Sequence, residues 1–455
     1  MFDEGIKNMQ EKNQKRALAI WGVLLGALFF ILPVHAQDQI APSSSPNSLG
    51  SGARAIGMGG AFIAISDDGT AASWNPAGLI QLERPEMSVV LDCMRRKEDN
   101  SFGTNPEASG LEAVNNCNLN YLSVTCPFKV NHRDMVASLS YQRLYDFTRD
   151  WNFNLALDNP VFIGPVQYDY ERNGALYALS FSYSFRITSY FSAGFTLNYW
   201  GDSLSQNKWE QKNRMEYVFS PADSEKIIYY SSDIKDEYAF QGWNANMGFL
   251  FKINNSWTLG GVFKTPFTAD LDHTKTKRDI TSSLSSPEND SHEIFSSRED
   301  YEKLRMPMSY GIGLAYRFSD NFTISGDIYR THWNDFESED AQGKRTSPVT
   351  GEDMSKSDID PTTSLRMGAE YLIIGKKTVV PLRAGIFYDP APAEGSPDDY
   401  YGFSLGTGLT YKRFILDIAC QFRFGNDVGC SILQALDFSQ DVQEHTVFTS
   451  LIIRF

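Results

Sequence analysis

A regular alternation of apolar and small polar residues restricts the fold of this chain more than any other feature. Between residues 177 and 186 every second residue is aromatic or apolar, and the residues between them are small or polar. A matching segment at 191–199 follows a turn at Thr188-Ser189. The two segments are therefore predicted to form a β-hairpin with one apolar face and one face rich in Ser, Gly, Thr and Asn.

The same pattern recurs along the chain and predicts about 14 strands. We expect them at residues 86–95, 118–129, 134–147, 177–186, 191–199, 243–253, 257–263, 310–318, 322–328, 362–374, 378–389, 400–411, 413–425 and 445–455. Tight turns of about two to four residues alternate with connections of about 10 to 36 residues. Short periplasmic turns and long extracellular loops produce this alternation in bacterial outer-membrane barrels.

A soluble β-sandwich is the main alternative, because its strands also alternate. Its outward face would be polar, however, and its turns would not be sorted by parity into short and long. In this chain the apolar face carries Tyr, Phe and Trp near the strand ends, as an aromatic girdle at a lipid boundary does. The prediction is an all-β, 14-stranded antiparallel transmembrane barrel in the bacterial outer membrane.

Residues 1–36 have the parts of a secretory signal: a basic start, an apolar run from Ala17 to Val34, and a small residue, Ala36, before the expected cleavage site. A membrane anchor is the alternative, because the apolar run approaches the length of a spanning helix. Pro33 favours cleavage. Losing this segment removes four basic and three acidic residues from a chain of net charge −15 and leaves −16. An acidic chain of this kind is not expected to bind nucleic acid.

A segment rich in Gly and Ala, residues 53–90, stands between the signal and the first strands. Its Asn75-Pro76-Ala77 motif predicts a turn that stops a helix. The glycines that allow unusual backbone geometry are Gly57, Gly59 and Gly60. An ordinary Gly-rich loop is one interpretation, but a compact plug fits a position just before a barrel better. We expect a hatch at residues 37–85 inside a barrel at 86–455.

Several segments resemble the FadL family of outer-membrane transporters for long-chain fatty acids and other hydrophobic compounds. They are Arg54-Ala55, Asp67-Asp68, Asn75-Pro76-Ala77, Arg84-Pro85, and the stretches 304–336 and 382–392. The resemblance implies a 14-stranded barrel, an N-terminal hatch, and a ligand route that leaves sideways through the wall. It implies passive transport without ATP or a cofactor. The expected partners are a hydrophobic small molecule such as a fatty acid, outer-membrane lipid and the barrel assembly machinery.

Two features of the sequence leave more than one cargo and more than one function compatible with this resemblance. The segments at about 204–237 and 269–304 are rich in charged residues, whereas the family has an apolar capture surface on these outer loops. The Gly-rich and WNPAGL stretches also resemble PorV-like barrels, which bind partner proteins in protein secretion. The segments at 304–336 and 382–392 favour transport, so a secretion partner is the alternative prediction.

If the aromatic faces point to lipid, strand parity directs a set of charged residues into the lumen. They are Arg186, Lys264, Arg317, Asp327, Arg366, Glu370, Arg383, Asp417 and Arg423. Lys264, Arg366 and Arg383 are the candidate ligand-binding residues, because a buried carboxylate ligand needs a cation. The alternative is that such charges pair with one another or with the plug.

Neither catalysis nor metal binding is predicted, because none of the histidines lies in a recognisable nucleophile or metal motif. The five cysteines include no CxxC pair, and Cys420 and Cys430 are the two that we consider for a disulfide.

The terminal residue, Phe455, follows an alternating apolar segment and resembles the assembly signal of outer-membrane proteins. Deleting Phe455 is therefore expected to reduce insertion into the outer membrane. Heat-modifiable migration of the barrel in membrane fractions measures this, and a normal amount of folded barrel in the variant would refute the assignment.

Overall fold

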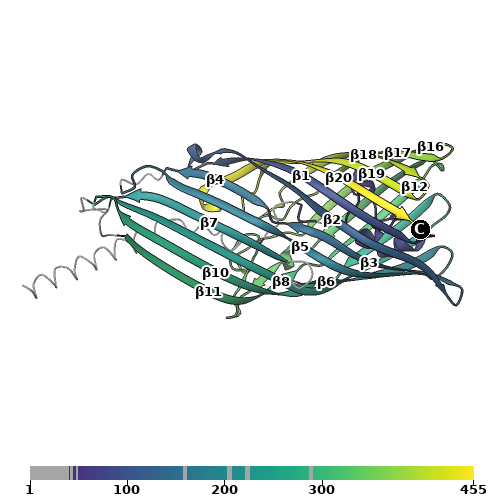
Figure 1. Ribbon diagram of the computed structural model, residues 1–455, viewed down its shortest axis with the longest axis horizontal. Coiled ribbons are helices and arrows are strands. Elements are labelled where there is room, and N and C mark those ends of the chain that lie inside the picture. The colour runs from purple at the N-terminus through teal and green to yellow at the C-terminus, as the bar shows by residue number, and fades with distance from the viewer. Residues whose placement is uncertain are drawn as a thin grey trace, which may run out of the picture.

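The computed structural model is a long barrel with short turns at one end, where the C-terminus lies, and a taller wall at the other (Figure 1). It describes residues 40, 45–47, 50–156, 161–201, 207–220, 226–285 and 291–455. The predicted signal, residues 1–36, lies outside the described residues. Within the described residues, no helix is long and apolar enough to cross a bilayer.

Fourteen antiparallel strands close into a barrel, which confirms the predicted fold class. The ring closes between the first and last strands, from Glu86 opposite Arg454 to Phe102 opposite Phe438. The N–H of Phe455 extends this seam by donating to the carbonyl of Pro85 at 3.0 Å. The barrel strands are β1 (Glu86–Phe102), β2 (Gly110–Val130), β3 (Arg133–Asp146), β5 (Val166–Arg186), β6 (Phe191–Trp200), β8 (Ile228–Lys252), β9 (Trp257–Lys264), β12 (Ser309–Arg317), β13 (Phe322–Thr331), β16 (Thr362–Ile374), β17 (Thr378–Tyr388), β18 (Tyr401–Tyr411), β19 (Phe414–Val428) and β20 (Phe438–Arg454).

The charged segments that we expected to be outer loops mostly form further strands. β7 pairs with β5 and β8, and β10 pairs with β8 and β11, so one side of the wall continues beyond the barrel. We call this part the extension. Its strands, besides the upper parts of β5 and β8, are β4 (Arg149–Leu155), β7 (Lys208–Phe219), β10 (Phe267–Ser283), β11 (Ser291–Met306), β14 (Glu337–Glu339) and β15 (Arg345–Thr346).

The extension largely reverses the barrel pattern, because most of its charged residues face outward and its apolar clusters face inward, although Arg149, Arg172 and Asp236 are buried. On the outer surface, Lys235 Nζ lies 3.2 Å from Glu210 Oε2 on the neighbouring strand. Charged surfaces of this kind belong in water, so the extension stands outside the membrane. The alternation is hard to see in the sequence of these strands because charged residues outnumber the apolar ones.

Two apolar clusters fill the interior of the extension. The distal core comprises Phe102, Ala108, Trp151, Phe153, Leu155, Val166, Tyr168, Tyr170, Tyr217, Phe219, Tyr230, Leu433, Leu436 and Phe438. The proximal core, at the junction with the barrel, comprises Ile40, Phe147, Leu176, Ala178, Trp200, Trp209, Tyr238, Phe240, Ala269, Leu271, Leu304, Met306, Trp333, Phe336 and Val349. Together they make the interior above the barrel apolar and aromatic.

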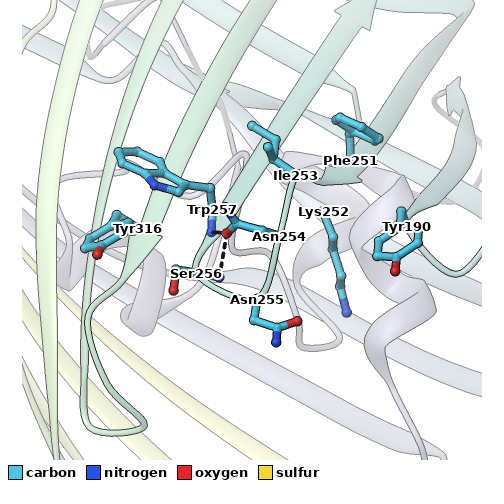
Figure 2. Close-up of a pocket in the computed structure, with 9 residues that line it drawn as sticks. All are labelled: Tyr190, Phe251, Lys252, Ile253, Asn254, Asn255, Ser256, Trp257 and Tyr316. Carbon is cyan, nitrogen blue, oxygen red and sulfur yellow. Dashed lines mark hydrogen bonds between the residues drawn. The ribbon is translucent and has the colours of Figure 1, made fainter.

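Aromatic residues gather at both edges of the apolar band on the barrel exterior. At the outer edge, the rings of Tyr199 and Trp243 lie 4.6 Å apart. At the other edge, Figure 2 shows the β8–β9 turn, where Asn254 Oδ1 accepts from the N–H groups of Ser256 and Trp257, each at 2.8 Å. An open depression of about 660 Å³ surrounds this turn on the barrel surface. It belongs to the aromatic girdle at the membrane boundary and not to the lumen.

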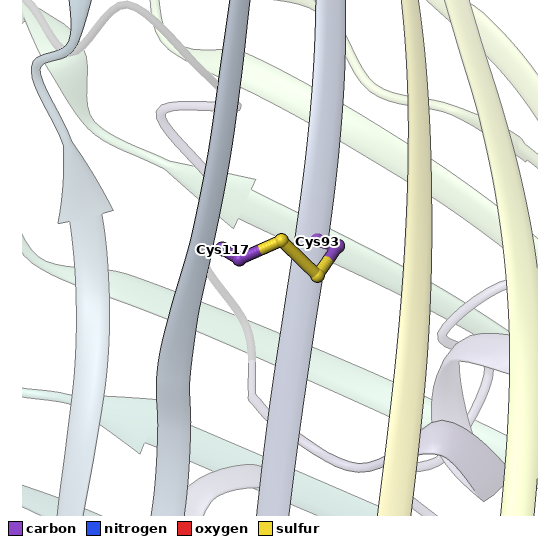
Figure 3. The surroundings of a disulfide bond; sticks show 2 residues. All are labelled: Cys93 and Cys117. Carbon is purple, nitrogen blue, oxygen red and sulfur yellow. A yellow bond between two sulfur atoms is a disulfide. The ribbon is translucent and has the colours of Figure 1, made fainter.

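A disulfide joins Cys93 on β1 to Cys117 on β2, where the two residues stand opposite each other with 4.1 Å between Cα atoms (Figure 3). The expectation for Cys420 and Cys430 is wrong, because both are free and exposed. Cys420 lies within β19 and Cys430 just after it, so the extended chain holds them about 30 Å apart.

A buried histidine lies between two carboxylates inside the extension. His273 Nε2 lies 2.8 Å from Asp236 Oδ1, and its Nδ1 lies 2.8 Å from Glu302 Oε1. Burial alone would lower the pKa of His273, but the hydrogen bonds to both carboxylates outweigh burial and raise the pKa to about 9. The imidazole also stacks on Tyr238, with 4.2 Å between ring centroids.

We expect the extension to lose stability as the pH rises through about 9. The pKa of His273 in the folded state exceeds its ordinary value of about 6.5, so its stabilising effect is complete below about pH 6.5 and is lost as the imidazolium deprotonates. Thermal unfolding followed by near-ultraviolet circular dichroism measures this. His273→Gln should flatten the pH profile, and exposed His292→Gln is the matched control. Parallel profiles for the wild type and His273→Gln would contradict the assignment.

Candidate functional site

The hatch consists of three short helical turns inside the barrel, near the end with short turns (Figure 1). They are α2 (Ala53–Gly57), α3 (Ala71–Trp74) and η2 (Pro76–Gln81). Most of their residues are buried. Small residues allow this, because the turns contact the barrel wall through backbone atoms as much as through side chains.

Glycines on both sides make this close contact possible. Gly59 and Gly60 follow α2 with φ of 68° and 76°, a region that other residues rarely adopt. A Cβ on Gly368 of β16 would lie 2.1 Å from the carbonyl oxygen of Met58, and one on Gly385 of β17 would lie 2.2 Å from the backbone nitrogen of Gly59. Gly57 does not have a positive φ, but it packs against Gly406 of β18. A Cβ added to Gly57 would lie 3.1 Å from the Gly406 Cα.

The Asn75-Pro76-Ala77 motif fixes the hatch to the opposite wall. Asn75 Oδ1 accepts from the N–H of Ala77 at 3.1 Å and caps η2. Asn75 Nδ2 donates to the carbonyls of Ile63 and Phe249, each at 2.9 Å. Phe249 lies on β8, so one amide side chain ties two parts of the hatch to the barrel.

Charged side chains also connect the hatch to the wall. Arg54 of the hatch pairs with Asp67 and, at 2.9 Å, with Glu370 on β16. Glu370 also accepts from Arg383 Nε at 2.7 Å, and Arg383 Nη1 lies 2.6 Å from Asp417. Arg383, predicted to bind a ligand, is therefore placed between two wall carboxylates.

The other two predicted ligand-binding residues lie in different surroundings. Arg366 donates to the carbonyl of Gly59 at 3.2 Å and lies 3.1 Å from Asp389 Oδ1. Lys264 lies at the end of β9, with Nζ 5.7 Å from the ring centroid of Tyr329. Arg317, also expected in the lumen, is instead exposed at a turn, 3.3 Å from Asp320.

A cavity of about 140 Å³ lies between the hatch and the wall, and Arg366 is the one member of the predicted trio that lines it. The cavity mixes apolar and charged side chains. Its lining residues are Ser45, Asn47, Gly50, Ile56, Trp74, Asp92, Met94, Asn120, Arg143, Leu144, Tyr145, Asp146, Arg366, Phe387, Asp389, Gln421, Arg423, Glu444, Thr446 and Phe448.

The cavity reaches a gap between β2 and β3. Pairing of these strands stops at Tyr121 opposite Gln142. On β3, Arg143 faces Tyr177 and Tyr145 faces the next residue, Leu176, so Leu144 is an extra, bulged residue. The gap ends where Asn116 Nδ2 donates to Asp146 Oδ2 at 3.1 Å.

On β2, Asn120 is the extra residue that corresponds to Leu144 on β3. It is skipped where the β1–β2 register shifts, and its Oδ1 is buried without a hydrogen-bond partner among the described residues. Neither Asn120 nor Leu144 was predicted from the sequence, because strict alternation assumes regular strands. The sequence has one sign of this bulge: Gln142 and Arg143 are consecutive polar residues, which breaks the alternation. In the structure both are buried.

Comparison with known proteins places this architecture among outer-membrane channels. The family model described as outer membrane protein transport protein (OMPP1/FadL/TodX) matches residues 43–431. No curated protein sequence matches the chain.

Solved structures with a similar fold include a Pseudomonas aeruginosa FadL homologue, at 14% identity over 89% of this chain and 98% of that chain, with a TM-score of 0.58. The toluene transporter TodX of Pseudomonas putida is 14% identical over 89% and 98% of the two chains, with a TM-score of 0.56. The CymD monoaromatic hydrocarbon channel is 16% identical over 90% and 98%, with a TM-score of 0.51.

Gly368→Ala tests whether close contact with the wall holds the hatch in place. The added methyl group would lie 2.1 Å from the Met58 oxygen, and overpacking of this kind costs about 1–3 kcal/mol. We expect the hatch to shift and single-channel conductance in planar bilayers to rise severalfold. Gly110→Ala is the control, because nothing lies within 4 Å of its Cβ position. Equal conductance of the two variants would count against a tightly fitted hatch.

Proposed function

The chain belongs to the outer membrane protein transport family (OMPP1/FadL/TodX), and we propose that it lets hydrophobic small molecules cross the bacterial outer membrane by passive diffusion. Long-chain fatty acids and monoaromatic hydrocarbons are the two cargo classes to consider. The first follows from the resemblance to FadL, and the second from the similarity to TodX and CymD. The proposal assigns the chain no enzymatic activity.

The observation that carries this proposal is the cavity that meets the β2–β3 gap. The apolar distal and proximal cores fill the interior above it, so a cargo molecule that enters between them contacts apolar side chains instead of water. The hatch blocks the straight path below. An alkyl chain gains about 0.8 kcal/mol for each CH₂ that leaves water, so sideways release into lipid avoids hydrating the cargo again.

The predicted ligand-binding residues take different roles in this proposal. Arg366 lies along the route because it lines the cavity. Arg383 fixes Glu370 and Asp417 and so supports the hatch–wall contact. Lys264 stays a candidate for contact with cargo, and Lys264→Ala should then weaken binding of a fatty acid without preventing folding.

One observation favours the secretion alternative. In the part of the chain that the structure describes, residues 291–302 of β11 pair with β10 alone, and only 303–305 also pair with β14. An exposed strand edge can accept a strand from a partner protein. A PorV-like role would use this edge.

Deleting Leu144 tests the sideways route. The deletion removes the bulge and allows β3 to continue in register beside β5, which should close the gap. We expect uptake of radiolabelled toluene and oleate by cells carrying the deletion to fall to the level of cells with an empty vector. Leu144→Ala, which keeps the bulge, is the control and should retain most of the uptake.

Full uptake by the deletion variant, with a correctly folded barrel, would refute the route through the gap. No uptake by the wild type, together with a secretion defect in cells that lack this chain, would replace transport by the PorV-like function.

A further inference from the structure

We infer that the cavity above the hatch selects uncharged hydrophobic cargo and disfavours carboxylates. This inference rests on the proposed transport function and narrows its substrate class. It follows from the charges around the cavity. The lining contains four carboxylates and three guanidinium groups, which are Asp92, Asp146, Asp389, Glu444, Arg143, Arg366 and Arg423.

Each guanidinium group already has an acidic neighbour. Arg143 Nη2 lies 2.5 Å from Asp146 Oδ2. Arg366 and Arg423 share Asp389, at 3.1 Å and 3.9 Å. Arg423 also lies over the ring of Tyr400, with 3.6 Å from Cζ to the ring centroid. The three guanidinium groups therefore have two carboxylates, Asp146 and Asp389, beside them before any cargo arrives.

Asp92 on β1 and Glu444 on β20 lie farther from cations, although Arg423 stands opposite Glu444 on the neighbouring strand. Both side chains are 6% exposed. Among the described residues, neither carboxylate has a basic nitrogen within 4 Å, and Asp92 Oδ1 and Glu444 Oε2 have no hydrogen-bond partner. With four carboxylates and three guanidinium groups, the lining carries an excess of one negative charge when all of them are ionised.

A carboxylate cargo would meet this excess in a space with little water, where like charges repel strongly. A neutral molecule would not. The Nε atoms of Arg143, Arg366 and Arg423 have no hydrogen-bond partner among the described residues. They can donate to the oxygen of a neutral hydroxyl group, which in turn donates to Asp92 or Glu444. Apolar side chains, including Trp74 and Phe387, complete the lining. Hydrocarbons and alcohols fit these surroundings.

The test compares isosteric pairs in proteoliposomes that contain the full-length protein. The pairs are dodecanol with dodecanoate and toluene with benzoate, each corrected for entry into protein-free vesicles of the same lipid. We expect the protein-dependent rate for the neutral member to exceed that for the anion at least tenfold. The double variant Asp92→Asn/Glu444→Gln should raise the anion-to-neutral ratio severalfold.

The matched control is Asp233→Asn/Glu237→Gln on the outer surface of the extension, where both carboxylates are exposed. This variant should leave the ratio unchanged. Equal protein-dependent rates for alcohol and carboxylate in the wild type would overturn the inference and leave the transport function intact. If all four compounds enter vesicles equally fast with and without the protein, both the inference and the proposed transport function are overturned. The wild-type comparison decides the inference even where the double variant fails to fold.

Discussion

The structure depends on close backbone contact between the hatch and the barrel wall. The contact requires glycine on the wall, as at Gly368 and Gly385, and left-handed glycines on the hatch, as at Gly59. Asn75 and the Arg54–Glu370 pair fix the same segment from other directions. Breaking a buried ion pair costs about 3–5 kcal/mol, so these contacts strongly oppose displacement of the hatch.

Under the proposed transport function, a fixed hatch leaves the wall as the place where cargo can leave. A transmembrane barrel needs every strand paired, because an unpaired backbone group in lipid costs several kcal/mol. The β2–β3 gap departs from this rule over a few residues only, between the pair Tyr121–Gln142 and the hydrogen bond from Asn116 to Asp146. Asparagine side chains at the gap offer polar groups where the strand pairing is missing. In the part of the chain that the structure describes, this break in the β2–β3 pairing lies beside the cavity.

Alternation in the sequence predicted the barrel strands because lipid on one side and the hatch on the other impose a period of two. Residues 208–219 escaped prediction, because their inward face includes the polar residues Gln211 and Asn213, which interrupt the apolar alternation. The disulfide could not be predicted, because Cys93 and Cys117 meet only through the β1–β2 register. Parity placed Arg366 and Arg383 in the lumen, but their carboxylate partners come from other strands and depend on the tertiary structure.

The most direct test of sideways passage is photocrosslinking during transport. A photoreactive residue is placed at Leu144, beside the gap, or at Gln81, at the end of η2, and cells are supplied with tritiated dodecanol. Passage through the gap predicts crosslinked cargo at position 144 and none at position 81. Crosslinking at position 81 without crosslinking at 144 would show that cargo passes through the hatch, and would contradict this account.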